Sequence, residues 1–113
     1  MKLGKVCHLT SVHYQDDVRI FLKECTSLAA YGFDVSLIAA GDKTSEDYKN
    51  GVKRFSISIP IKNQLKRILL YTRTVYRKAL QINADIYHFH DPELFPIGLK
   101  LKRLNKKVII DSH

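Results

Sequence analysis

Short apolar runs alternate with longer segments of helical period along this chain, and this alternation constrains its fold more than any other feature. The segment 33–40 (FDVSLIAA) is almost continuously apolar, which is typical of a strand covered on both faces. In 18–29 the apolar residues instead fall on one helical face, and Gly32 follows as a helix stop. Strands and helices that alternate in this way favour a parallel, Rossmann-like sheet with right-handed crossovers.

The predicted order of elements is β-α-β-β-α-β-α-β, an α/β fold with a mostly parallel sheet flanked by helices. Strands are expected at 5–10, 33–40, 52–59, at the start of 85–94 and at 107–111, and helices at 18–31, 63–83 and from 95 or 96 to 104. The third strand is expected to be peripheral and the last one buried. Segments 11–17 and 41–51 are interpreted as polar loops. A chain of 113 residues is long enough for one core, so 1–113 is expected to be a single Rossmann-like domain.

Polar side chains gather where the strand that begins 85–94 (DIYHFHDPEL) ends before Pro92. Ligands of open α/β sheets bind beyond the carboxyl ends of the strands. Residues that follow several strands are therefore expected to meet at one cleft although they lie far apart in sequence. The candidates are His13, Asp17, Arg19, His90, Asp91, Glu93 and His113.

These candidates also have structural explanations. His88 and His90 lie two residues apart on a strand and point the same way, so with Asp91 they are conceivable metal ligands. A third and fourth ligand are not evident from the sequence, and no metal is predicted. At least one of the two histidines can instead be a hydrogen-bonded core residue, and Asp91 a turn residue before Pro92.

Two common phosphate-binding patterns are absent. No G-x-G-x-x-G follows the first strand, where residues 11–17 (SVHYQDD) contain no glycine, and no G-x-x-x-x-G-K-[ST] loop occurs. Classical NAD binding and P-loop nucleotide hydrolysis are therefore disfavoured, and no spacing of a nucleophile–base triad is present.

The chain is basic, with a formal net charge of +8, which favours anionic partners. Nine basic residues and no acidic ones lie between Lys49 and Lys78. Those on the predicted helix 63–83 form a basic arc in which Leu70 and Tyr71 are embedded. This arc is either a solvated face or a surface that contacts anionic lipid or a phosphorylated acceptor. Its members include Lys66, Arg67, Arg73 and Arg77.

The cysteines and the absence of long apolar runs bear on the cellular compartment expected for this chain. Cys7 and Cys25 sit among apolar neighbours and are expected to be small buried thiols in a reducing cytosol, with a disulfide or a reactive thiol as the alternatives. No apolar run approaches a signal peptide or the roughly 20 residues of a membrane span. A cytoplasmic chain, at the inner face of the membrane if the basic arc binds lipid, is expected. No nucleic-acid-reading motif occurs.

Five segments together resemble the N-terminal domain of family 4 glycosyltransferases of bacterial polysaccharide synthesis. They are 8–13 (HLTSVH), 17–25 (DVRIFLKEC), 31–35 (YGFDV), 85–94 (DIYHFHDPEL) and 107–113 (KVIIDSH). The resemblance implies the GT-B fold, in which two Rossmann-like domains face each other across a cleft. In that fold the N-terminal domain mainly holds the acceptor, and the C-terminal domain holds a nucleotide-sugar and carries a paired-glutamate motif.

The resemblance also implies a reaction. The family transfers a sugar from a nucleotide-sugar, the co-substrate, to a polysaccharide or lipid-linked acceptor, with retention of anomeric configuration and usually without a bound metal or other cofactor. His113 matches a histidine that faces the donor sugar. The family's glycine pair in the first loop is absent here, so His13, Asp17 and Arg19 are expected to shape the acceptor pocket instead. His90, Asp91 and Glu93 are expected to form another part of the same acceptor pocket.

The sequence departs from the family in length. It ends at His113, before further N-terminal strands and the donor domain, and contains no paired-glutamate motif. We therefore expect an incomplete domain, inactive alone, whose donor domain is supplied by a missing C-terminal part or by a partner chain. The alternative is a non-catalytic Rossmann-like module that binds a partner or an anionic membrane surface through its basic helix.

Overall fold

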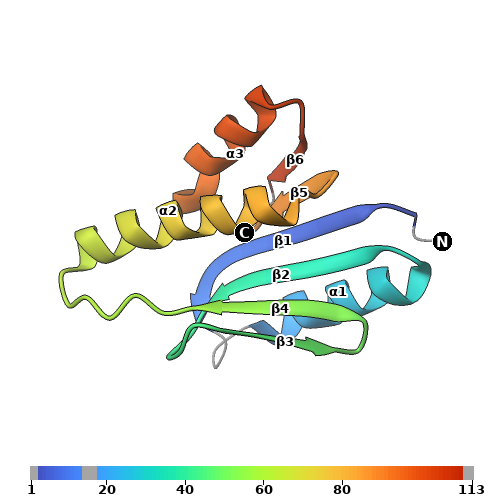
Figure 1. Cartoon of the computed structure of the whole chain (residues 1–113), viewed down its shortest axis with the longest axis horizontal. Coiled ribbons are helices and arrows are strands. Elements are labelled where there is room, and N and C mark those ends of the chain that lie inside the picture. The colour runs from blue at the N-terminus through green and yellow to red at the C-terminus, as the bar shows by residue number, and fades with distance from the viewer. Residues whose placement is uncertain (1–2, 14–17, 111–113) are drawn as a thin grey trace.

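The computed structural model describes residues 3–13 and 18–110, with the side chains of 12–13 and 18–21 left out of the description. A six-stranded sheet carries helices on its faces (Figure 1). The strands are β1 (Lys5–His13), β2 (Asp34–Ala40), β3 (Ser45–Lys49), β4 (Val52–Ile57), β5 (Ile86–Phe89) and β6 (Lys107–Ile110). The helices are α1 (Val18–Tyr31), α2 (Gln64–Ile82), the 3-10 helix η1 (Pro92–Leu94) and α3 (Phe95–Arg103).

The sheet order is β3-β4-β2-β1-β5-β6, and every neighbouring pair is parallel except β3 with β4. Without β3, the order corresponds to 3-2-1-4-5, the first five strands of the classic doubly wound Rossmann sheet. The predicted fold class, a mostly parallel α/β sheet flanked by helices, is therefore confirmed.

Four local predictions were wrong. The expected loop 41–51 contains β3, which is too polar and exposed to show a strand pattern, and which pairs Asp47 with Arg54 across the hairpin. As a result β4, expected at the periphery, is an inner strand. The expected loop 11–17 begins too early, because β1 continues to His13. β6 is an edge strand rather than a buried one, with Ile109 and Ile110 exposed by 49% and 45%.

The core forms on both faces of the sheet. Cys25 of α1 packs against alternate residues of β2, including Val35 and Leu37. On the other face α2 and α3 cover a larger cluster that includes Tyr87 and Phe89 of β5. The alternation of side chains along each strand assigns them to these two faces. Cys7 and Cys25 are buried free thiols, and burial raises the pKa of Cys25 to about 12.

The long helix α2 has the predicted limits, with the Asn63 side chain accepting from the Lys66 amide and Asn83 in the left-handed conformation at the other end. Its buried residues are Tyr71, Val75 and Ala79. The predicted apolar face was wrong in its first half, because α2 extends beyond the strand ends and leaves Leu65, Ile68 and Leu69 exposed (Figure 1). Tyr71, expected within the basic arc, is buried.

Among the described residues, no helix combines the length and the apolarity that crossing a membrane requires.

Candidate functional site

The carboxyl ends of β1 and β5 form the point at which the order of connections along the sheet reverses. From β1 the chain proceeds through β2 to β4 on one side, and then returns to β5 and β6 on the other. Open α/β sheets bind ligands in the crevice at such a switch point. The residues that follow β1 and β5 are therefore the structural candidates for a site.

Asp91, the second residue after β5, joins the two strand ends. Its Oδ2 accepts a hydrogen bond of 2.6 Å from the Thr10 hydroxyl and one of 2.8 Å from the Ser11 backbone N–H. Hydrogen bonds to a carboxylate are stronger than those between neutral groups. Asp91 therefore holds β1 and the turn after β5 in a fixed relation, which is more than the turn role that its place before Pro92 indicates.

Two further contacts fix the same region. The Ser11 hydroxyl donates to the Glu93 carboxylate, and the buried Tyr71 hydroxyl donates to the Thr10 carbonyl at 2.5 Å. The second contact ties α2 to the end of β1. The strand end, the turn and the helix thus form one hydrogen-bonded unit.

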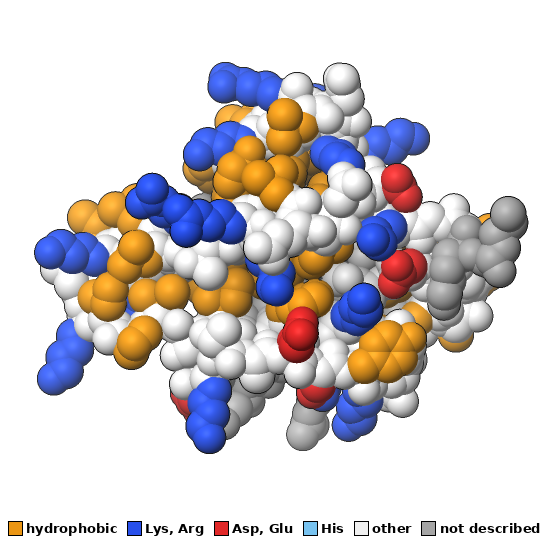
Figure 2. Space-filling model, in the orientation of Figure 1, with side chains coloured by type: hydrophobic (Ala, Val, Ile, Leu, Met, Phe, Trp, Pro, Cys, Tyr) orange, Lys and Arg blue, Asp and Glu red, His pale blue; other side chains and the backbone are white. Residues whose placement is uncertain are grey.

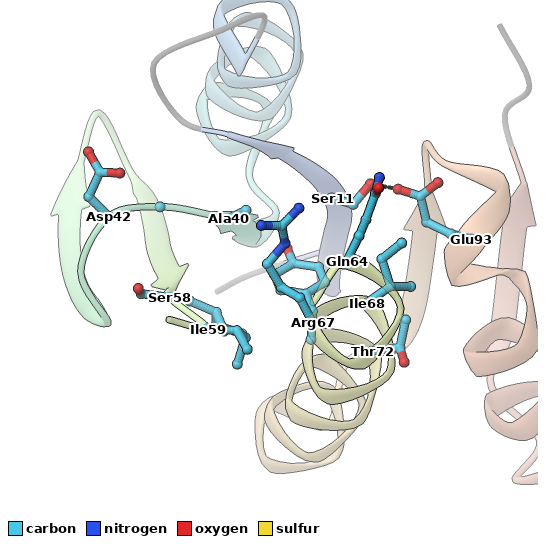
Figure 3. Close-up of a pocket in the computed structure, with 13 residues that line it drawn as sticks. Ser11, Ala40, Asp42, Ser58, Ile59, Gln64, Arg67, Ile68, Thr72 and Glu93 are labelled. Atoms are coloured by element: carbon cyan, nitrogen blue, oxygen red, sulfur yellow. Dashed lines mark hydrogen bonds between the residues drawn. The ribbon is translucent and has the colours of Figure 1, made fainter. Parts of the chain in front are cut away.

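A pocket of about 470 Å³ opens beside this unit, beyond the ends of β1, β2 and β4 (Figure 3). Hydroxyl, amide and charged side chains line it, and apolar ones form part of its wall. The polar lining includes Ser11, Asp42, Ser58, Gln64, Arg67 and Glu93. This mixture of donors and acceptors matches a hydroxyl-rich ligand such as a sugar, with Arg67 available for an anionic group.

Arg67 is the cationic side chain of this pocket. It extends from α2 toward the sheet (Figure 3) and forms no ion pair with any described residue. Its carboxylate counterparts across the pocket are Asp42 and Glu93. A guanidinium with its donors available binds a carboxylate or phosphate through two parallel hydrogen bonds.

Three histidines form a second cluster, on the sheet face that α1 covers. His8 of β1 and His88 of β5 are register partners, and His90 follows β5. His8 Nδ1 and His90 Nε2 lie 3.0 Å apart. Burial, and then the neighbouring rings of His88 and His90, lower the pKa of His8 to about 3, so this imidazole is neutral at physiological pH.

The predicted site residues separate into three groups. Asp91 and Glu93 lie at the switch point, and Glu93 lines the pocket. His90 is buried in the histidine cluster rather than open to the pocket. The remaining positions lie wholly or in their side chains outside the described residues: Asp17 and His113 wholly, and His13 and Arg19 in their side chains.

Sequence reasoning missed several residues of the site. Thr10 and Ser11 are polar residues at the end of a strand, and the same rule that selected Asp91 could have found them. Tyr71 and Gln64 were not found because their role depends on how α2 rotates against the sheet. The basic residues of α2 also separate: Arg67 lines the pocket, whereas Lys66, Arg73 and Arg77 are exposed on another side of the helix.

Comparison with known proteins gives a family match and several structural neighbours. A family model described as Glycosyltransferase Family 4 matches residues 18–113. No match is found among curated protein sequences.

The structural neighbours share the fold at low sequence identity. The C-terminal domain of a hydrogenase from Pyrococcus furiosus aligns with a TM-score of 0.65 and 14% identity, over 98% of this chain and 93% of that one. A sucrose-phosphate synthase from Thermosynechococcus elongatus aligns with a TM-score of 0.68 and 12% identity, over 96% and 33%. A trehalose-6-phosphate protein from E. coli bound with UDP-2-fluoro glucose aligns with a TM-score of 0.66 and 12% identity, over 94% and 32%. The chain therefore spans about a third of the length of the last two proteins.

Proposed function

This chain belongs to glycosyltransferase family 4, and from that membership we propose that it forms the acceptor side of an enzyme that transfers a sugar from a nucleotide-sugar with retention of configuration. The family match supports a transferase, and its structural neighbours include GT-B glycosyltransferases. The pocket beyond β1, β2 and β4 carries the assignment of the acceptor, because its hydroxyl, amide and charged groups suit a polysaccharide or lipid-linked saccharide.

In this proposal the residues of the switch point prepare the pocket. Asp91 fixes the end of β1, and Ser11 and Glu93 then present oxygen atoms to the hydroxyl groups of the acceptor. Arg67 binds an anionic group of the acceptor, such as a carboxylate or a phosphate. Because Asp91 holds the Ser11 backbone and the Ser11 hydroxyl donates to Glu93, little ordering of these two groups is required when the acceptor binds.

The donor is assigned mainly to a second domain. We propose that a nucleotide-sugar-binding domain, on the same polypeptide or on a partner chain, faces this pocket, as in the two-domain arrangement that the family resemblance implies. His113 is the residue of this chain that we assign to positioning of the donor sugar, by its match to the family's histidine. The proposal requires no metal or other resident cofactor for transfer.

Kinetics of the enzyme that contains this domain together with its donor domain test both assignments. Arg67→Ala is expected to raise the KM for the acceptor about tenfold or more at little cost in kcat, because it removes binding to a group remote from the reacting atoms. His113→Ala is expected to depress kcat by 100-fold or more, on the order expected when a group that acts on the transition state is lost. Lys53→Ala, which changes an exposed basic residue outside the pocket, is the matched control. An unchanged acceptor KM in Arg67→Ala would remove the pocket from the proposal, and unchanged turnover in His113→Ala would remove the donor role.

A contact with anionic membrane is a second proposed property, favoured by the part of α2 that extends beyond the sheet. Leu65 and Leu69 are exposed by 69% and 61% on a face that also carries Lys66 and Arg73. Figure 2 shows hydrophobic and basic side chains next to one another over this end of the molecule. Exposed leucines flanked by cations are the features by which a helix lies on an anionic bilayer.

Co-sedimentation with vesicles tests the membrane contact. The chain is expected to sediment with vesicles that contain phosphatidylglycerol and not with pure phosphatidylcholine vesicles. Reversing Lys66, Arg73 and Arg77 to Glu should abolish sedimentation, since each basic residue near an anionic surface contributes about 1 kcal/mol. Reversal of Lys100, Lys102 and Arg103 on α3 provides a control with the same change of charge. Equal sedimentation by the two triple variants would contradict a specific contact through α2.

A further inference from the structure

The three histidine rings meet at the switch point, on the opposite face of the sheet from α2. The ring centroids of His88 and His90 lie 4.3 Å apart, and those of His8 and His88 lie 4.8 Å apart. Each ring offers one nitrogen, and these three nitrogens all lie within 4.8 Å of one another. His8 and His88 come from two adjacent, paired strands, and the backbone N–H of His90, just after β5, donates to the Leu9 carbonyl.

The environment of this cluster is unusual for histidines that serve only as packing. His8 is fully buried, and its Nε2 has no hydrogen-bond partner within the described part of the chain. A buried polar atom without a partner is costly, and a bound ion is one of the few explanations for it in a native protein. His90 is also buried, with 3% of its surface exposed.

We propose that His8, His88 and His90 bind a divalent transition-metal ion of the Zn²⁺ class. Imidazole nitrogen is a preferred ligand of zinc, and three histidines leave one position for water or another ligand. Tetrahedral coordination with Zn–N distances of about 2.0–2.1 Å places ligand nitrogens about 3.4 Å apart, so small ring rotations bring the three nitrogens into range. Among the described residues, these three histidines are the set that meets the geometry.

Glu24 of α1 gives the cluster an outer contact. Its Oε1 lies 4.0 Å from His88 Nδ1. A carboxylate near one ring nitrogen of a histidine favours the proton on that nitrogen and leaves the other nitrogen to bind the metal. Glu24 is therefore assigned to orienting His88, not to the metal itself.

The proposed ion would act on the acceptor site through the chain. His90 is followed directly by Asp91, and His8 lies two residues before Thr10. Both partners of the hydrogen bond between Thr10 and Asp91 therefore lie within two residues of a proposed metal ligand. Binding of the ion would fix the turn after β5 from the α1 face while Asp91 fixes it from the strand ends. The sequence indicated two of these ligands, and the fold adds His8 from a strand far away in the sequence.

Equilibrium dialysis of the intact chain against Zn²⁺, with excess Mg²⁺ present, tests the site. One Zn²⁺ per chain is expected, and His88→Gln should weaken binding by at least about 100-fold, since even loss of an outer contact weakens metal binding by about 10–100-fold. Glu24→Gln should fall within that smaller range. Glu46→Gln, which changes an exposed carboxylate on β3, should bind as the wild type does. Circular dichroism of each variant checks that it is folded.

X-ray absorption at the zinc edge of the wild-type complex supplies a readout that needs no variant. Scattering from three imidazole rings is expected. Equal binding of Zn²⁺ by His88→Gln, a shell without imidazole, or wild-type binding no tighter than that of Mg²⁺ would each overturn the proposal.

Discussion

Replacing Phe89 by Ala is expected to lower the free energy of unfolding by about 3–5 kcal/mol, the usual cost of deleting a buried aromatic ring. Phe89 is the last residue of β5, and its side chain is fully buried in the cluster that α2 and α3 cover. Its ring lies so close to Gly98 of α3 that a Cβ at that position would be 3.4 Å from Cε2. Because little space remains around the ring, its removal leaves a cavity that neighbouring side chains fill only in part.

Urea denaturation measures this effect as a shift of the midpoint at an unchanged m-value. Tyr31→Ala is the matched control, because it removes an aromatic ring that is 79% exposed, and it should change the free energy by less than about 0.5 kcal/mol. Small domains have a free energy of unfolding of about 5–15 kcal/mol, so Phe89→Ala alone would remove a large part of it. Equal effects of the two substitutions would show that β5 is not packed as described.

Replacing Asp91 by Ala is expected to lower the free energy of unfolding by roughly 3 kcal/mol and to abolish binding of the acceptor. The carboxylate accepts from Thr10 Oγ1 and from the Ser11 amide, and each hydrogen bond to a charged group contributes about 1.5–3 kcal/mol. Without it, the Ser11 N–H loses its partner and the end of β1 is no longer fixed to the turn after β5. Ser11 and Glu93 then lose the positions from which they line the pocket.

Asp91→Asn separates the two consequences. Its amide oxygen can still accept from the Ser11 N–H, so stability should recover in part, to within about 1.5 kcal/mol of the wild type. Unfolding in urea reports the stability, and saturation-transfer NMR with saccharides reports the binding. Glu46→Ala, which removes a carboxylate from the exposed strand β3, should leave both unchanged. Full saccharide binding by a folded Asp91→Ala chain would refute the role given to this contact.

The sequence was sufficient for the parts of the fold that rest on strong local patterns. The apolar run of β2 and the helical period of α1 with Gly32 after it predicted a parallel sheet and the limits of a helix. β3 was missed because none of its five residues is buried, so no hydrophobic alternation exists, and its pairing depends on contacts with β4 such as that between Arg54 and Asp47.

The site was predicted only as far as topology carries. The rule that the carboxyl ends of parallel strands meet at one edge correctly predicted that the start of the 91–94 turn lies at the end of β1. It could not show on which side of the sheet each residue lies, and so grouped His90 with Asp91 although their side chains serve different clusters. The role of Tyr71 was unpredictable for a related reason. Its spacing placed it beside basic residues, but α2 turns that side toward the sheet where the strands still lie beneath it.

Under the proposed membrane contact, the part of α2 that extends beyond the strand ends would also determine how the acceptor reaches the pocket. Adjacent residues of an α-helix point about 100° apart, so Lys66 and Arg67 face different surroundings although they are neighbours in sequence. A lipid-linked saccharide held in the bilayer beneath Lys66 would need to travel only around the helix to reach Arg67. Its search would be confined to two dimensions, and its effective concentration at the pocket would be set by tethering rather than by its bulk concentration. The same helix would then determine both the affinity for the membrane and the rate of acceptor capture.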